Sequence, residues 1–243
     1  MRLTPKFVYC DNHLLAADKP SGLPSQPDAS GDASLADLAK EYVRAEFAKP
    51  GEVYLALLHR LDRPTSGLVL LARTSKAAAR MADAFRRRTV DKRYLALVEC
   101  SAAPENERRL TDYLSPLGNG GMKVAPRKTG DSREARLAYR TLAVRNDGGR
   151  ALLEIGLETG VKHQIRCQLA HAGLPVVGDF RYGPFGKPAR PEAIADGRAI
   201  LLHAWRVGFE HPVRREPVLL TAPPPAHWRE PLAALPAGEL DLG

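Results

Sequence analysis

Short apolar segments of strand length, separated by turn residues, most constrain how this chain can fold. They occupy residues 7–17, 53–58, 67–72, 94–100, 135–144, 151–158 and 199–209. The best apolar run, GLVLLA at 67–72, suits a buried strand and is far shorter than the roughly 18 residues of a membrane span. Closely spaced strands are typical of antiparallel sheets, so we expect a sheet-rich fold and no membrane segment.

Three further segments have the apolar spacing of helices. The first starts after Ser34 and runs to about residue 48, the second starts at Thr74 or Ser75, and the third ends at Gly173. Residues 115–130, which are rich in glycine and basic groups, predict a mobile loop. Strands outnumber helices and the sequence has no Walker or dinucleotide-type glycine loop. The expected fold class is therefore α+β, with a mixed, mostly antiparallel central sheet and flanking helices.

The positive charge is concentrated in the middle third of the chain. The net charge is +8, and residues 76–150 hold 17 Lys/Arg against 9 Asp/Glu, whereas the flanking segments are each neutral. The densest basic groups in this segment are Arg86, Arg87, Arg88, Lys92, Arg93, Lys123, Arg127 and Lys128. A basic surface of this kind attracts a polyanion, so a nucleic-acid partner is favoured over a merely solvated basic face.

The three cysteines predict reduced thiols in a cytoplasmic protein. Cys10, Cys100 and Cys167 are odd in number, and their spacing fits neither a disulfide framework nor a zinc site. The N-terminal residues lack the apolar run of a signal peptide. His163 and His203 are widely spaced and have no acidic or cysteine cluster beside them, so no metal is expected.

The segment HRLDRPTSG at 59–67 joins two apolar strands by a turn and is the first candidate for chemistry. Asp62 would lie at the tip of this turn, with Arg60 and Arg63 helping to keep its carboxylate ionised. Such a carboxylate can act as a nucleophile or a base. Taken alone, the pattern favours a turn-forming aspartate with solvated ion pairs.

The segment TGVKHQIRCQLAHAG at 159–173 is the second candidate. Lys162, His163 and Arg166 lie near the start of the expected helix and away from its apolar stripe. Arg166 could present a planar fork to a carboxylate. Taken alone, the segment favours an exposed helix arginine without a role.

Together these segments resemble the RluA-type family of RNA pseudouridine synthases. HRLDRPTSGLVLLA is similar to the catalytic signature of that family, and KRYLALV at 92–98 is similar to its tyrosine motif. The blocks LLAADKPSGLPSQP, HQIR, PVVGD and LHA follow the family order. The matches span roughly residues 8 to 225, and six ordered blocks are a specific signal.

The resemblance implies a pseudouridine synthase fold with two sub-lobes around a catalytic cleft. It implies one catalytic domain over 1–243, with a Pro- and Ala-rich surface tail from 221 to 243. Many relatives carry an extra N-terminal RNA-binding domain, and this chain is expected to lack it. A monomer without a cofactor, acting on ribosomal or transfer RNA, is the expected state.

The resemblance also implies roles for individual residues. Asp62 is the catalytic carboxylate, Arg166 is the arginine placed against it, and Tyr94 is the tyrosine that packs on the target base. Arg63 is a candidate for filling the space of the extruded uridine or for holding a phosphate. Further substrate-binding candidates are His59, Arg60, Lys162, His163, Arg86, Arg87 and Lys92.

Two departures from the family pattern stand beside HQIR. Val161-Lys162 replaces the frequent Arg-Thr, so Lys162 either substitutes for a lost cation or leaves one phosphate contact unmade. Cys167-Gln168 stands where Val-His is frequent. A non-catalytic RNA-binding or chaperone protein on the same fold is the main alternative, and a metal-dependent RNA hydrolase is a more remote one.

Overall fold

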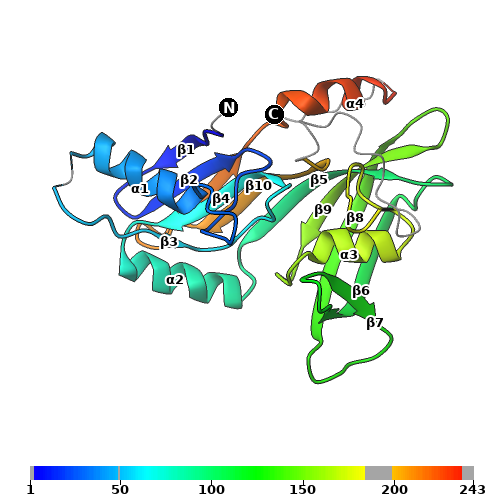
Figure 1. Ribbon diagram of the computed structural model, residues 1–243, viewed down its shortest axis with the longest axis horizontal. Helices are drawn as coiled ribbons and strands as arrows, with labels where there is room; N and C mark the ends of the chain where they lie inside the picture. Colours follow the sequence, from blue (N-terminus) through cyan, green and yellow to red (C-terminus); the bar gives the residue numbers. More distant parts are fainter. Residues whose placement is uncertain (1–2, 49, 184–198, 237–243) are drawn as a thin grey trace. The chain divides into compact units, whose positions relative to one another are not determined.

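The computed structural model describes residues 3–48, 50–183 and 199–236. The chain divides into two compact units. The first contains residues 1–91 and 204–223, and the second contains residues 92–203 and 224–242. Each unit is built around strands, as Figure 1 shows.

The first unit contains the strands β1 (Lys6–Cys10), β2 (Leu14–Lys19), β3 (Ala56–Leu57), β4 (Ser66–Ala72), β11 (Pro217–Thr221) and most of β10 (Leu202–Glu210). Their order is β1-β2-β4-β10, with β3 beside β4 and β11 beside β10. The pairs β1–β2, β2–β4, β3–β4 and β10–β11 are antiparallel. The turn that carries Asp62 connects β3 to β4.

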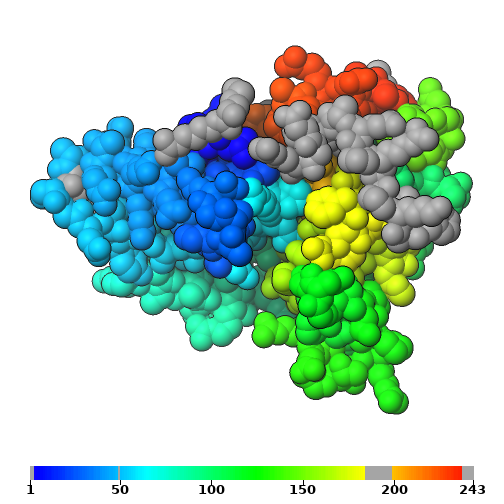
Figure 2. All heavy atoms as spheres, in the orientation of Figure 1, coloured from blue at the N-terminus to red at the C-terminus, as the bar shows by residue number. Residues whose placement is uncertain are grey.

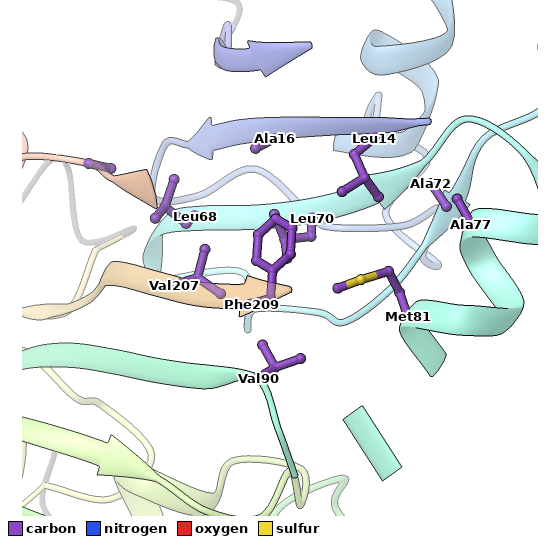
Figure 3. Close-up of a cluster of buried hydrophobic side chains, with 11 residues drawn as sticks. Leu14, Ala16, Leu68, Leu70, Ala72, Ala77, Met81, Val90, Val207 and Phe209 are labelled. Atoms are coloured by element: carbon purple, nitrogen blue, oxygen red, sulfur yellow. The ribbon is translucent and has the colours of Figure 1, made fainter. Parts of the chain in front are cut away.

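Both faces of the strands β2 and β4 are buried. Leu14 and Leu70 pack with Met81 of helix α2 (Ser75–Arg86) in one apolar cluster, as Figure 3 shows. Leu15 and Leu71 point to the opposite face and are also fully buried. The helix α1 (Leu35–Glu46) begins at Ser34 with the expected cap, completed by Asp37 as a capping box.

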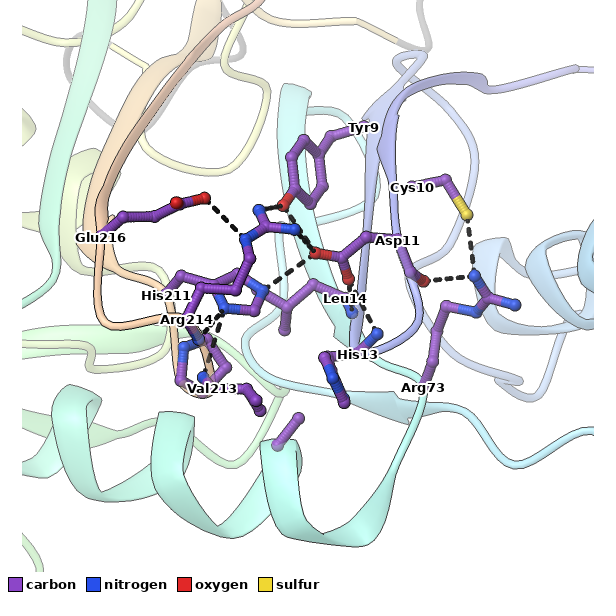
Figure 4. A network of polar contacts seen from close by, with 12 residues as sticks. Tyr9, Cys10, Asp11, His13, Leu14, Arg73, His211, Val213, Arg214 and Glu216 are labelled. Atoms are coloured by element: carbon purple, nitrogen blue, oxygen red, sulfur yellow. Dashed lines mark hydrogen bonds and ion pairs between the residues drawn. The ribbon is translucent and has the colours of Figure 1, made fainter.

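A polar network around Asp11 joins two turns of the first unit, as Figure 4 shows. The Asp11 carboxylate accepts hydrogen bonds from Tyr9 (2.7 Å), from buried His211 Nε2 (2.9 Å) and from Arg214 (3.0 Å). Burial alone would raise the pKa of Asp11, but the backbone N–H groups of His13 and Leu14, together with Tyr9 and His211, lower it to about 2. The β1–β2 turn is therefore fixed to the β10–β11 turn.

The second unit contains most of β5 (Asp91–Glu99), then β6 (Glu107–Pro116), β7 (Met122–Ala125), β8 (Arg133–Val144) and β9 (Arg150–Leu157). The order is β5-β9-β8-β6-β7, and each neighbouring pair in this order is antiparallel. Helix α3 (Gln164–His171) follows β9. The β6–β7 hairpin and the loop after it project from this unit, in green in Figures 1 and 2.

Two buried glutamines attach α3 to the strands of the second unit. Gln164 Nε2 donates to the carbonyl of Arg136 on β8 (3.0 Å) and to Gln168 (3.0 Å). Gln168 Nε2 donates to Asp112 on β6 (2.7 Å) and to the carbonyl of Ala135 (3.1 Å). Gln168 is thus a framework residue at the position where the family often has histidine.

The α+β, mostly antiparallel architecture is confirmed, and three local predictions need correction. Residues 53–58 contain only the two-residue strand β3, and its residues are half-buried rather than buried. Within the loop expected at 115–130, residues 122–125 form β7, because they pair with β6. In the expected surface tail, residues 226–233 form the short helices η3 (Ala226–Trp228) and α4 (Arg229–Ala233).

That tail segment is anchored by a tryptophan. Trp228 is fully buried, and its ring makes an edge contact with the ring of His203 at 6.1 Å between centroids. A large aromatic side chain in a Pro- and Ala-rich stretch gives the segment enough apolar area to pack. Among the described residues, no helix is long and apolar enough to cross a membrane.

Candidate active site

Asp62 lies half-buried in the tight turn that leads into β4. The Thr65 N–H donates to the Asp62 carbonyl at 3.0 Å, which closes the turn. Leu61, Thr65 and Ser66 on either side of the turn are buried. The backbone of Asp62 is therefore held between a buried residue and the start of a central strand.

The loop after β2 supports this turn from outside. The Ser25 hydroxyl donates to the Leu61 carbonyl at 2.7 Å and accepts from the Leu61 N–H at 3.1 Å. The Gly22 N–H donates to the Arg63 carbonyl at 2.7 Å. These bonds immobilise both backbone neighbours of Asp62, and they explain why KPSGLPSQP and HRLDRPTSG occur together.

Lys19 is a fully buried cation of the first unit. Its side chain has 0% exposure, and its Nζ donates to the carbonyls of Leu23 (2.8 Å), Pro20 (3.1 Å) and Arg63 (3.3 Å). Burial lowers the pKa of Lys19 to about 7, and the negative charge of Asp62 opposes that shift. A group that stabilises both loops thus lies within electrostatic reach of Asp62.

The other predicted residues of this turn have partners of their own. Arg63 donates to the Gly22 carbonyl (2.9 Å) and forms ion pairs with Asp28 and Asp32. Arg60 donates to the Gln26 side chain (3.2 Å). His59 Nε2 accepts the N–H of Leu70 at 3.1 Å, so its ring is part of the framework beside β4.

The turn ends in Gly67, and its backbone geometry requires glycine there. Its φ is +110°, and a Cβ at this position would meet the carbonyl oxygen of Ala204 at 2.3 Å. Any side chain would therefore displace the backbone of β10. The Gly of HRLDRPTSG therefore lets the backbone of the LHA segment lie close to the end of this turn.

Arg166 lies in the second unit, where it is fixed by a buried carboxylate. Its Nε donates to Asp179 Oδ2 at 2.6 Å and its Nη2 donates to Asp179 Oδ1 at 2.9 Å. The side chains are 2% and 0% exposed. This two-point pair sets the plane of the guanidinium group.

His163 and Tyr182 complete the surroundings of Arg166. His163 precedes α3 with φ of 54°, and its Nδ1 lies 2.8 Å from the Tyr182 hydroxyl. The Tyr182 hydroxyl also accepts the N–H of Met122 on β7 at 2.8 Å. Its ring lies 5.1 Å from the guanidinium carbon of Arg166.

The remaining candidates occupy different environments. Tyr94 is 6% exposed on β5, opposite Ile155 of β9. Lys92 is half-buried on the same strand, and burial lowers its pKa to about 8. Lys162 is exposed before α3. Asp62 belongs to the first unit, whereas Tyr94, Lys162 and Arg166 belong to the second.

The basic residues divide into paired and unpaired groups. Arg86 and Arg87 at the end of α2 form ion pairs with Asp83, at 2.9 Å each. Within the described part of the chain, the cations of β7 and the loop after it form no ion pair or side-chain hydrogen bond. These are Lys123, Arg127 and Lys128.

Three important residues had no role in the sequence-based prediction. Lys19, Asp179 and Tyr182 all lie in or beside blocks that carried the resemblance, KPSGLPSQP and PVVGD. A lysine and an aspartate next to strand-like apolar segments were a usable signal, because buried charges need partners. Among the described residues, no group of three metal-binding side chains occurs, and all three cysteines are free thiols.

Known RNA pseudouridine synthases are similar to this chain over most of its length. The family model for RNA pseudouridylate synthases matches residues 13–171. Ribosomal large subunit pseudouridine synthase D of Xanthomonas campestris is 33% identical, over 94% of this chain and 68% of the relative. The mitochondrial pseudouridylate synthase RPUSD4 of Xenopus tropicalis is 32% identical, over 99% of this chain and 83% of the relative.

Solved structures show the same fold. Human RNA pseudouridylate synthase domain containing 4 superimposes with a TM-score of 0.77 at 22% identity, covering 94% of this chain and 92% of that one. Human RNA pseudouridylate synthase domain containing 1 gives a TM-score of 0.71 at 23% identity, covering 93% and 85%. With the sequence matches, this establishes that the chain belongs to the RluA-type family of RNA pseudouridylate synthases.

Proposed function

We propose that this protein isomerises uridine to pseudouridine within RNA and that Asp62 is the catalytic carboxylate. Membership of the pseudouridylate synthase family supports the reaction. The single observation that supports Asp62 is its turn, which is closed by Thr65 and held on both sides by Ser25 and Gly22. A carboxylate on a backbone held this firmly is suited to a fixed attack geometry.

The reaction requires a carboxylate and a closed pocket from the protein. The bond between uracil N1 and ribose C1′ breaks, the base turns, and C5 bonds to C1′ while the C5 proton leaves and N1 takes up a proton. Atoms and electrons balance without an oxidant, so we propose that no cofactor takes part. In this proposal, Asp62 supplies the nucleophile or base, and Arg166 orients its carboxylate.

Tyr94 and the turn residues are proposed to receive the target base. An enzyme that modifies a base inside folded RNA must extrude it first. An aromatic face such as that of Tyr94 can then stack on the uracil, which is typically worth about 1–3 kcal/mol. We propose Arg63, with its ion pairs to Asp28 and Asp32, mainly as a brace of the turn.

The RNA is proposed to contact the unpaired cations around β7, including Lys123, Arg127 and Lys128. Cations without protein partners can replace their counterions with RNA phosphates without breaking an ion pair within the protein. Lys92, Lys162, Arg86 and Arg87 remain further candidates. A bacterial relative is named for the large ribosomal subunit, so we propose ribosomal RNA first and transfer RNA second, for a monomer in the cytoplasm.

Release of tritium from C5-labelled uridine in bulk RNA, without added metal, tests the reaction. The wild type should release tritium, and Asp62→Asn should abolish release while RNA affinity stays within about two-fold, because the side chain keeps its size. Mapping pseudouridines in RNA from cells with and without the gene would identify the substrate. Wild-type rates from Asp62→Asn would exclude Asp62, and RNA binding without any release would favour the non-catalytic alternative.

A further inference from the structure

The acceptor positions of Asp179 are filled from one side by Arg166 and from the other by backbone. Arg166 donates twice to its carboxylate, and the N–H groups of Arg181 (2.9 Å) and Tyr182 (3.1 Å) donate to Oδ1. A carboxylate with four donors has little freedom to rotate. The orientation of the guanidinium is therefore determined within the second unit, by the turn after PVVGD.

The pair also changes the electrostatic character of Arg166. At 0% and 2% exposure, the two side chains form a buried ion pair with no net charge. A neutral pair influences a third group mainly through directed N–H bonds at short range. Arg166 then acts by geometry, and an error of about 1 Å in its position can cost on the order of 100-fold in rate.

Tyr182 connects Arg166 and Asp179 to the β6–β7 hairpin. Its ring faces the guanidinium, and its hydroxyl takes the N–H of Met122, the first residue of β7, while contacting His163 at the start of α3. The residue after Met122 is Lys123, one of the unpaired cations. One side chain thus connects the expected RNA-contacting strand to the arginine and to its helix.

We propose that Asp179 and Tyr182 are positioning residues that act on the reaction through Arg166. Asp179 sets the plane of the guanidinium, and Tyr182 transmits the position of β7 to it. The proposal rests on the proposed role of Arg166 beside Asp62. It assigns a function to the GD-x-x-Y portion of the segment 178–182, where the sequence showed only a turn.

The first experiment compares Asp179→Asn with the wild type in single-turnover tritium release and in RNA binding. Asparagine keeps the size of the side chain but offers one acceptor oxygen instead of two. We expect the rate to fall by about 10- to 100-fold and RNA affinity to change less than three-fold. Asp112→Asn is the matched control, because Asp112 also accepts a bond from α3, through Gln168 rather than Arg166. It should keep the wild-type rate.

Asp179→Asn in an Arg166→Lys background distinguishes an effect on the position of Arg166 from a general destabilisation of the fold. Lysine cannot form the two-point pair, so Asp179→Asn should add less than about two-fold to the loss already caused by Arg166→Lys. Full additivity of the two effects would overturn the proposal. If Arg166→Lys itself retains the wild-type rate, the proposed role of Arg166 fails instead, and the two failures are thereby distinguished.

Two substitutions of Tyr182 test the connection to β7. Tyr182→Phe keeps the ring over Arg166 but removes the hydroxyl, and should lower the rate about three- to ten-fold. Thermal stability should also fall, because the N–H of buried Met122 loses its acceptor. Tyr182→Leu removes both contacts and should be slower still. Equal losses of rate and RNA affinity in Tyr182→Phe would instead show that Tyr182 is an ordinary binding residue and would reject its positioning role.

Discussion

The two units hold their candidate catalytic groups by opposite means. The turn of Asp62 is held through its backbone, by Ser25, Gly22 and the carbonyl-binding ammonium of Lys19. The guanidinium of Arg166 is held through its side chain, by the buried carboxylate of Asp179. Asp62 is half-buried, whereas Arg166 is almost completely buried.

Because of this difference, substitutions at Asp62 and Arg166 should affect stability and the reaction to different degrees. A carboxylate that is held by its backbone can be altered without leaving a buried charge behind. A guanidinium in a buried pair cannot, because its partner carboxylate would remain in a site of low dielectric constant. We therefore expect substitutions at Asp62 to affect the reaction alone, and substitutions at Arg166 to affect both folding and reaction.

The largest expected effect on stability is that of Arg166→Ala. It leaves Asp179 buried with only backbone donors, which should cost about 3–5 kcal/mol of the free energy of unfolding. Asp62→Asn should cost less than about 1 kcal/mol, since water reaches a half-buried side chain. Urea unfolding of both variants measures the contrast. Similar losses for the two would mean that the difference between the two regions does not hold.

Lys19→Met should have the next largest effect. Methionine fills a similar volume but leaves three carbonyls of two loops without their shared donor, at a cost of about 2–3 kcal/mol. Because the Arg63 carbonyl is one of them, the turn of Asp62 should loosen and the rate of tritium release should fall. Lys6→Met, on the exposed first residue of β1, is the control and should change neither quantity. An unaltered rate in Lys19→Met would show that the lysine contributes only to folding.

Lys19 should also make stability dependent on pH. Its folded pKa is about 7 and its ordinary value is 10.5. Between these values the unfolded chain holds a proton that the folded chain does not, so stability should rise with pH from about 7 to about 10.5. Below pH 7 both states hold the proton, and Lys19 contributes no further change. In Lys19→Met the part of the slope due to this residue should disappear when denaturation is followed across that range.

The smallest expected effect is on RNA affinity and concerns two pairs of basic residues, Arg127 with Lys128 and Arg86 with Arg87. Arg127→Ala with Lys128→Ala should reduce RNA affinity about ten-fold and lower the slope of log affinity against log salt by about 1 to 2, as expected for losing one or two phosphate contacts. Arg86→Ala with Arg87→Ala should do less, because both arginines already share the carboxylate of Asp83. Filter binding of RNA at several salt concentrations measures both slopes. The reverse order would place the RNA on α2 rather than on the loop after β7.

Much of the fold followed from local patterns, because strand length and capping chemistry act over a few residues. Ser34 and Thr74 begin their helices as expected, since each side chain bonds a backbone N–H three residues later. The strand β7 was missed for the complementary reason. Its four residues carry a lysine beside glycine-rich turns, and they become a strand only by pairing with β6.

The candidate site was predictable in part for the same reason. The motif around Asp62 is contiguous, so its residues could be considered together, and Arg166 was proposed from the block HQIR. The carboxylate that holds Arg166 was not identified, since it lies 13 positions away and follows a separate turn. The sequence also did not show that the cations near residue 127 are unpaired, because ion pairs depend on which acidic groups the fold brings near.

The sequence by itself determined the strand-rich fold class, the family and the concentration of positive charge between residues 76 and 150. Those properties depend on residue order and composition over short distances. Only the tertiary structure decided that Lys19 braces the Asp62 turn across 44 positions and that Asp179 holds Arg166. A buried charge is stable only beside its partner, and the identity of that partner is set by packing between distant segments.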